Sequence, residues 1–388
     1  MKFRFHVLGV PHTISNKDYV ACAFTQKVVK FCEMMQPRGH TIIHYGHSDS
    51  SVLCNENVAV TNNQVLSAAY GDYNWRKENF KYDLKDIAYQ TFYSNAIREI
   101  ARRKKPLDFL LCFWGWGHKT IADAHQDMLI VEPGIGYPGG VFAPYRVFES
   151  QSIMAAWNGM NAVNTPGSIS WYDAVIPNYF DLNDFEYNDQ KEDYFLCLGR
   201  VGEHKGVHIA IQATQEIGSR LIIAGQGSLR DMGYDKTPAH VEEVGYADAA
   251  TRRSLMSGAR GQFVATTYAE PFGGVQIEAM LSGTPVISTD WGCFGELNLH
   301  GITGYRCRTF DHFAWAADNI DTINPLNCRE WGENFSFERI APMFEEYCSN
   351  ITQLYDKSKG WYNRSKNRGD LNWLYRRYPS HPNRTLSS

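Results

Sequence analysis

The sequence lacks any closely spaced pair of cysteines. Its 388 residues include nine cysteines, an odd number scattered along the chain, and Cys-x-x-Cys does not occur. Disulfide frameworks and structural zinc sites both depend on paired or regularly spaced cysteines. The pattern therefore argues against a disulfide-stapled secreted domain and against a zinc ribbon. It favours reduced, mostly buried thiols in a cytoplasmic compartment.

Long hydrophobic runs are also missing. A membrane-spanning helix needs about 20 consecutive apolar residues, and no stretch of the sequence approaches this length. The first ten residues include basic side chains, but their apolar stretch is too short and too ionic for a signal peptide. They predict a first β-strand instead. We expect no integral membrane segment.

Charge of either sign is modest over the chain. Lysine and arginine number 38 and aspartate and glutamate 42, which gives a net charge of −4. Hydrophobic residues make up 44% and charged residues 21% of the chain, as in soluble globular proteins. A balance this mild does not identify a nucleic-acid or membrane partner by itself.

The carboxyl tail is the exception to this balance. Residues 357–388 contain eight basic residues and one acidic residue, together with five aromatic residues at positions 361, 362, 373, 375 and 378. Basic and aromatic side chains together suit nucleic-acid binding. The same aromatic side chains could anchor the tail on the first domain, which we favour. Normal stability of Trp361→Ala and Trp373→Ala, together with salt-sensitive nucleic-acid binding that is lost in both variants, would contradict that choice.

Strand-like and helix-like segments alternate in two successive series. Short apolar runs of the kind that a parallel sheet buries occur at 3–10, 39–45, 107–113 and 128–131, and again at 194–199, 220–225, 241–244 and 262–266. Helical spacing lies between them, for example at 19–35, 84–104 and 206–217. The alternation predicts two doubly wound α/β domains. We place them at 1–181 and 182–355, followed by the tail at 356–388.

The most informative run extends from Tyr268 to Pro285. Glu270 and Glu278 lie on either side of a glycine pair, and Glu278 is the only charged residue between positions 271 and 289. Residues 274–282 predict a helix that is buried on most sides, where a carboxylate is costly unless a polar group such as a sugar hydroxyl meets it. Glycines at a helix start let backbone N–H groups approach an anion. The run predicts a site for a phosphorylated sugar.

This run resembles the Glu-x7-Glu signature of retaining, family-4 type glycosyltransferases of the GT-B fold. It continues in their manner through residues 285–290 to Gly292, Gly295 and Glu296. The resemblance implies two Rossmann-like domains that face a cleft, with a nucleotide-sugar donor bound by the second domain. It implies that Glu270 contacts donor-sugar hydroxyls and that Glu278 binds the ribose. The intervening residues would contact the sugar and the diphosphate: Phe272, Gly273, Gly274 and Val275.

A second candidate segment is the loop Gly199-Arg200-Val201-Gly202-Glu203-His204-Lys205-Gly206. It follows a predicted strand, and open α/β sheets bind ligands at the carboxyl ends of their strands. The resembled family has an arginine and a lysine at matching places, which implies that Arg200 and Lys205 contact the donor diphosphate beside Gly199. Gly245 and Tyr246 lie where such proteins hold the base.

The amino-terminal half would then hold the acceptor. Its first loop contains His12 and Thr13 and lacks the glycine pair that many relatives carry there. Trp116 and His118 follow a buried strand, and the resemblance makes His118 a candidate near the reacting centre. Residues 132–138 predict an irregular loop, in which Tyr137 could contact substrate.

Asp-x-Asp, which often holds a cation on the donor diphosphate, does not occur in the chain. We therefore expect no essential metal and no cofactor, because the nucleotide-sugar is a substrate. The acceptor could be a glycan, a lipid-linked sugar or a hydroxylated base in nucleic acid. Two other classes remain open, namely a non-catalytic sugar-nucleotide binding protein and a retaining glycoside hydrolase. A diphosphate product with an acceptor requirement would distinguish transfer from hydrolysis.

Overall fold

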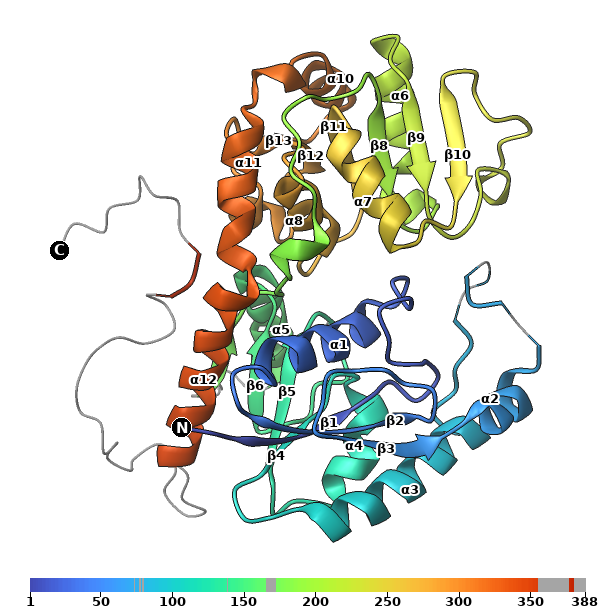
Figure 1. The fold of residues 1–388 in the computed structure, drawn as a ribbon. Helices are drawn as coiled ribbons and strands as arrows, with labels where there is room; N and C mark the ends of the chain where they lie inside the picture. Colours follow the sequence, from blue (N-terminus) through green and yellow to red (C-terminus); the bar gives the residue numbers. More distant parts are fainter. Residues whose placement is uncertain are drawn as a thin grey trace, which may run out of the picture. The chain divides into compact units, whose positions relative to one another are not determined.

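The computed structural model describes residues 1–72, 74–76, 78, 80–137, 139–164, 172–354 and 377–379 (Figure 1). The contacts within the chain divide it into two units. Unit 1 spans Met1–Tyr73, Phe80–Tyr179 and Phe337–Ser380. Unit 2 spans Asn74–Asn79, Phe180–Ser336 and His381–Ser388.

Unit 1 is built on a parallel sheet with the strand order β3-β2-β1-β4-β5-β6-β7. Its strands are β1 (Arg4–Leu8), β2 (Thr41–His47), β3 (Glu56–Thr61), β4 (Phe109–Leu111), β5 (Leu129–Ile135), β6 (Tyr145–Phe148) and β7 (Asp173–Val175). Its helices are α1 (Ala23–Met35), α2 (Asn63–Tyr70), α3 (Ile87–Arg103), α4 (Trp116–Asp123), α5 (Gln151–Asn164) and α12 (Phe337–Leu354).

Alternate side chains of the unit 1 strands enter two separate cores. In β4, Phe109 and Leu111 pack in the cluster that contains residues of α1 and α12, whereas Leu110 packs in the cluster that contains residues of α3. Figure 1 shows α1 on one face of this sheet and α3 with α4 on the other. Burial of both faces is the reason why the strands of this sheet are short apolar runs.

The last long helix, α12, belongs to unit 1 although it follows unit 2 in the sequence. Its buried side chains, among them Ile340, Phe344 and Tyr347, lie in the same core as α1. Glu345 of α12 accepts two hydrogen bonds from Arg38, at 2.9 and 2.7 Å, and lies 3.0 Å from Nε2 of His40. The predicted domain boundary at residue 355 therefore differs from the unit boundary at Phe337. The apolar face of α12 could not reveal from sequence which of two sheets would bury it.

Most of the basic aromatic tail, including Trp361 and Trp373, lies outside the described residues. Among the three described tail residues, Arg377 donates a hydrogen bond to Glu346 of α12. The side chain of Tyr378 packs against two hydrophobic clusters of unit 1. The nucleic-acid interpretation of the tail stays a prediction.

Unit 2 repeats the architecture with a parallel sheet of order β10-β9-β8-β11-β12-β13. Its strands are β8 (Phe195–Leu198), β9 (Leu221–Ala224), β10 (Val241–Gly245), β11 (Gly261–Val264), β12 (Val286–Thr289) and β13 (Gly304–Cys307). Its α-helices are α6 (Val207–Glu216), α7 (Ala249–Gly258), α8 (Gly274–Leu281), α9 (Phe294–Leu297), α10 (Phe310–Asp318) and α11 (Pro325–Gly332). Short 3-10 turns lie at η1 (Leu182–Asp184), η2 (Glu203–Lys205), η3 (Arg230–Met232), η4 (Ile320–Thr322) and η5 (Glu333–Phe335). The predicted pair of doubly wound α/β domains is confirmed.

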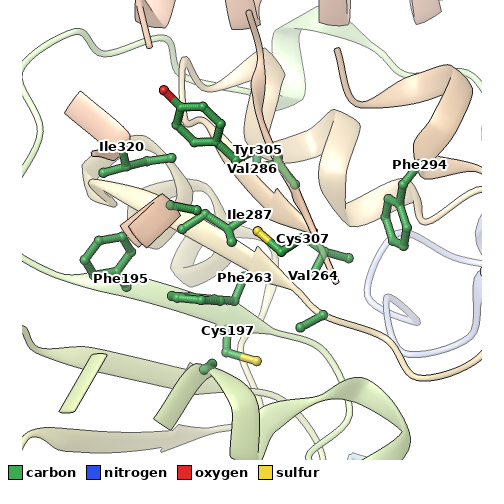
Figure 2. Close-up of a cluster of buried hydrophobic side chains, with 14 of the residues drawn as sticks. Phe195, Cys197, Phe263, Val264, Val286, Ile287, Phe294, Tyr305, Cys307 and Ile320 are labelled. Carbon is green, nitrogen blue, oxygen red and sulfur yellow. The ribbon is translucent and has the colours of Figure 1, made fainter. Parts of the chain in front are cut away.

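One core of unit 2 is formed by neighbouring strands whose buried side chains meet in the interior. Figure 2 shows Phe195 and Cys197 of β8 near Phe263 of β11, with Ile287 of β12 and Cys307 of β13 beyond them. All of these side chains are at most 7% exposed. The buried thiols here are reduced packing groups, as the scattered cysteine pattern predicts.

The prediction that residues 132–138 form an irregular loop is wrong for the first four of them. β5 continues to Ile135, and Val131 and Glu132 pair with β6. Fully buried Glu132 accepts hydrogen bonds from the backbone N–H groups of Phe142 and Ala143, at 2.9 and 2.8 Å, and from the hydroxyl of Tyr137 at 2.7 Å. These donors offset the cost of burying a carboxylate in a strand, which the sequence could not show.

Gly206 lets two loops of unit 2 approach closely. Its φ is +69°, and a Cβ there would lie 1.9 Å from the carbonyl oxygen of Ala265. Gly218 has nearly the same backbone conformation, with φ +67°, but open space around it. A comparison of alanine substitutions at the two positions therefore distinguishes the free-energy cost of a left-handed backbone from the cost of a steric clash.

We predict that Gly206→Ala destabilises the protein clearly more than Gly218→Ala. The left-handed backbone should cost about 1–2 kcal/mol at either position, and the collision should add roughly 1–3 kcal/mol at position 206 alone. Urea unfolding of both variants measures the difference. Equal losses in the two variants would show that the loops of unit 2 relax freely.

Candidate functional site

The candidate site lies at the carboxyl edge of the unit 2 sheet, where the strand order reverses. The chain leaves β8 towards β9 and β10 and then returns to β11 on the other side of β8. The loops after β8 and β11 therefore start side by side and run apart. In open α/β sheets this switch point is where ligands bind.

Three side chains from these two loops form one hydrogen-bonded network. Oε2 of Glu270 accepts from the hydroxyl of Tyr268 at 2.7 Å and lies 3.2 Å from Nζ of Lys205. Nζ of Lys205 also donates to the Tyr268 hydroxyl. The Lys205 side chain is 25% exposed and the Glu270 side chain 11%. Burial, together with the adjacent Glu270 carboxylate, raises the pKa of Tyr268 well above its usual value.

The structure thus brings together two of the predicted site residues, Lys205 and Glu270. The role of Tyr268 was missed, because its place two residues before Glu270 carries no signal in the sequence. The backbone also holds this network in place. The N–H of Thr267 donates to the carbonyl of His204 at 3.0 Å, and the N–H of Cys293 donates to the carbonyl of Glu270 at 3.0 Å.

The start of α8 lies directly after Glu270. Gly273 precedes the helix with φ +63°, a conformation that few other residues adopt, and α8 begins at Gly274. The N–H groups of Gly274 and Val275 have no intrahelical acceptor because they belong to the first turn. Phe272 is only 1% exposed and packs in the core of unit 2, so its predicted contact with a donor is possible through the backbone alone.

Glu278, the second glutamate, meets a protein cation. Its Oε2 lies 2.5 Å from Nη2 of Arg252 on α7, and both side chains are less than one-fifth exposed. The sequence predicts that a polar group meets this carboxylate, and Arg252 is such a group. Arg252 was missed because it is one of two adjacent arginines on a helix whose sequence does not show which of them faces Glu278. Arg252 occupies one oxygen of Glu278.

The remaining donor-side candidates lie at neighbouring strand ends. Gly199 follows β8, and its N–H donates to Ala224 at 2.9 Å, while Gly245 ends β10 with φ +76°. Arg200 is exposed and forms no ion pair within the described parts of the chain. The ring of Tyr246 makes an edge contact with Trp75, 5.9 Å between centroids. Trp75 was not foreseen, because it lies far from Tyr246 in the sequence.

The acceptor-side candidates of unit 1 are mostly internal. His12 and Thr13 are 2% and 1% exposed. Nδ1 of His12 lies 2.9 Å from the Tyr89 hydroxyl, and the hydroxyl of Thr13 lies 2.6 Å from that of Thr25. Trp116, in contrast, is 60% exposed at the start of α4. Among these three, Trp116 alone is placed to meet a ligand with its side chain.

His118 is fully buried and bonded on both sides of its ring. Nε2 donates to the carbonyl of Gly9 at 3.0 Å, and Nδ1 accepts from the N–H of Trp114 at 3.3 Å. Burial lowers the pKa of His118 to about 3, with a smaller opposing effect from the bond to Gly9. In this conformation His118 joins the loop after β1 to α4 and does not face a substrate. A lone histidine cannot be assigned to either role from sequence.

Neither a metal site nor a membrane-crossing helix is found in the described residues. No group of three or more His, Cys, Asp or Glu side chains in that part of the chain is arranged to hold a metal ion. No described helix combines the length and the apolar character that a membrane crossing requires.

The family model described as Glycosyl transferases group 1 matches residues 181–334. An uncharacterized glycosyltransferase of Methanocaldococcus jannaschii is 27% identical over 209 residues, 49% of this chain and 52% of that protein. Glycogen synthase of Mycobacterium tuberculosis is 34% identical over 132 residues, 31% of this chain and 32% of that protein. The chain thus spans about half or less of the length of these relatives.

A similar fold occurs in Anabaena HepE, whose structure was solved in complex with UDP and glucose. It superposes with a TM-score of 0.65 and 16% identity, covering 89% of this chain and 99% of that chain. The two parallel-sheet units have the GT-B fold.

We predict that acid destabilises unit 1 through three buried histidines. Burial lowers the pKa of His12 and His118 to about 3 and of His44 to about 4, whereas an unfolded histidine titrates near 6.5. Between these values the unfolded chain binds more protons, so stability present above pH ~6.5 is lost as pH falls. Each histidine should contribute a slope of up to about 1.4 kcal/mol per pH unit.

Urea unfolding at several values from pH 7.5 to 4.5 tests this. His44→Gln should make the slope of the unfolding free energy against pH shallower, even if the substitution also changes stability at pH 7.5. His300→Gln, at an exposed position of unit 2, should leave this slope unchanged. A free energy of unfolding that is constant over this range would contradict the prediction.

Proposed function

Residues 181–334 form a domain of the Glycosyl transferases group 1 family, and from this premise we propose that the protein is a retaining glycosyltransferase. It transfers a sugar from a nucleotide-sugar donor to an acceptor hydroxyl and needs no metal. The observation that carries the proposal is the Lys205–Glu270 pair at the sheet switch point, directly before the start of α8.

The first step of the proposal concerns the donor diphosphate. Lys205 and Arg200 supply positive charge, and the first N–H groups of α8 add donors aimed at an anion. Lys205 contacts Glu270 in the structure. A bound diphosphate would share Lys205 with Glu270, whose carboxylate can also accept hydrogen bonds from donor-sugar hydroxyls. Stabilising the departing diphosphate with fixed charges would supply much of the rate enhancement.

Glu270 then acts by position and not as a covalent nucleophile. Its Oε2 already accepts one hydrogen bond from Tyr268 and one from Lys205. Two donors on one oxygen disperse the negative charge and weaken the carboxylate as a nucleophile. The same two donors hold the carboxylate in one orientation, which suits a group that must align a sugar.

Glu278 holds the nucleotide ribose in this proposal. Arg252 contacts Oε2 and orients the carboxylate. This carboxylate can also accept hydrogen bonds from the ribose hydroxyls, and charge-assisted bonds of this kind are the stronger ones. We assign the nucleotide base to Gly245 and Tyr246, which lie at the carboxyl end of β10.

The acceptor class is the least constrained part of the proposal. A glycan or a lipid-linked sugar is favoured, in keeping with glycosyltransferase relatives that include glycogen synthase and a phosphatidyl-myo-inositol mannosyltransferase of Mycolicibacterium smegmatis. A hydroxylated base in nucleic acid is the remaining alternative. A thermal-shift screen of UDP-, ADP- and GDP-sugars, followed by mass analysis of products on candidate acceptors, tests donor and acceptor separately. Tight donor binding without turnover on any acceptor would favour a binding protein, and donor hydrolysis without transfer would favour a hydrolase.

We predict different effects for the two glutamates. Glu278→Ala should weaken donor binding by about 1–3 kcal/mol, because it removes hydrogen bonds to the ribose. Glu270→Ala should mainly lower kcat, because the reacting sugar loses its alignment. Calorimetry and initial rates on folded variants measure both. Glu242→Ala, in an exposed ion pair with Arg220, is the control. Unchanged donor affinity in Glu278→Ala would remove the ribose assignment.

Activity should survive removal of divalent metal. Dialysis against EDTA should leave the rate unchanged, because Arg200, Lys205 and the start of α8 neutralise the diphosphate. The double variant Arg200→Ala, Lys205→Ala should lose turnover while its circular dichroism and unfolding midpoint stay close to those of the wild type. Complete loss of activity after dialysis, with recovery in Mg²⁺ or Mn²⁺, would mean that a cation neutralises the diphosphate instead.

A further inference from the structure

A third basic side chain lies on the loop that carries Arg200 and Lys205. His204 precedes Lys205 in η2, and the residue is exposed. Its ring nitrogens form no hydrogen bond within the described residues, so they remain able to contact a ligand.

The position of His204 at the switch point is set by backbone contacts. Its carbonyl accepts from the N–H of Thr267 at 3.0 Å, which ties η2 to the loop after β11. The His204 ring lies 6.2 Å from the ring of Tyr268, centroid to centroid. The hydroxyl of that tyrosine is in the network with Glu270 and Lys205. His204 is therefore a neighbour of the same network.

Burial and two neighbouring cations oppose the protonation of His204 in the free protein. Burial, followed by Arg200 and Lys205, lowers the pKa of His204, and Glu270 opposes this with a smaller effect. Four groups face the His204 ring. Two come from the loop after β11, Tyr268 and Glu270, and two come from its own loop, Arg200 and Lys205. An anion placed among the three basic residues would reverse this balance, because it would favour the charged imidazolium.

We propose that His204 is a ligand of the donor diphosphate that is neutral in the free protein and protonated in the complex, so that donor binding takes up a proton. The inference rests on the proposed function, since it assumes a nucleotide-diphosphate donor. By linkage, proton uptake on binding means that donor affinity rises as pH falls through the neutral range. The limit for one proton is tenfold in Kd per pH unit.

Calorimetric titration with nucleotide-sugars tests the proposal, and UDP-glucose, ADP-glucose and GDP-mannose are the probes. Nucleotide-sugars are required because a terminal phosphate, as in free UDP, titrates itself near pH 6. For any probe that binds, we expect a several-fold lower Kd at pH 6 than at pH 8. At pH 7 the heat should depend on the ionisation enthalpy of the buffer, with net proton uptake.

Two substitutions separate a ligand from a structural histidine. His204→Gln should bind the probe more weakly and with little pH dependence, because it cannot become charged. His204→Lys should bind tightly at every pH from 6 to 8, because it carries the charge permanently. His300→Gln, an exposed histidine of unit 2, should keep the wild-type pH dependence.

The outcomes also separate this inference from the proposed function. If none of the probes binds, the nucleotide-sugar proposal itself fails. If a probe binds but His204→Gln keeps the wild-type pH dependence and proton uptake, the inference about His204 is wrong while the proposed function stands.

Discussion

The contact between Lys205 and Glu270 is the interaction on which the candidate site depends. It joins the loop after β8 to the loop after β11, at the point where the order of the unit 2 sheet reverses. A charged pair that is partly removed from water is stable only with good geometry and further hydrogen bonds, and Tyr268 supplies such a bond. The pair therefore holds these two loops together and leaves the partly exposed Lys205 ammonium group where an anionic ligand can contact it.

The same requirement recurs at other buried or partly buried carboxylates in the described parts of the chain. Glu278 is matched by Arg252, and Glu132 by two backbone N–H groups and a tyrosine hydroxyl. In unit 1, Glu149 forms an ion pair with Lys27, a lysine whose pKa burial lowers to about 7. Each of these acids lies in or directly after a strand, or on a helix next to the sheet. Lys27 lies on α1 and Arg252 on α7, so the pairs with Glu149 and Glu278 also specify how these elements are arranged.

Sequence reasoning succeeded where a residue's role follows from its neighbours in the chain. The strands β1, β8 and β9 and the helix α8 were predicted to within about two residues, because apolar runs and glycines mark them locally. It was wrong for Glu132–Ile135, where glycine and proline predicted a loop and tertiary hydrogen bonds made a strand. Sequence reasoning also predicted His12 and Thr13 as ligand contacts, although both side chains are buried. A polar residue in a loop can bond to protein or to ligand, and only its surroundings decide.

By itself the sequence determined the class of fold and the position of the Glu-x7-Glu motif. Alternating apolar runs dictate two parallel sheets, and the isolated charge of Glu278 in an apolar helix demands a polar partner. Which partner that is, Arg252, was decided only by the tertiary structure, as was the assignment of α12 to unit 1. The physical reason is the same in both cases. Local patterns indicate that an apolar face must be buried or that a charge must be paired. Packing between residues far apart in the chain determines which group buries the face or pairs with the charge.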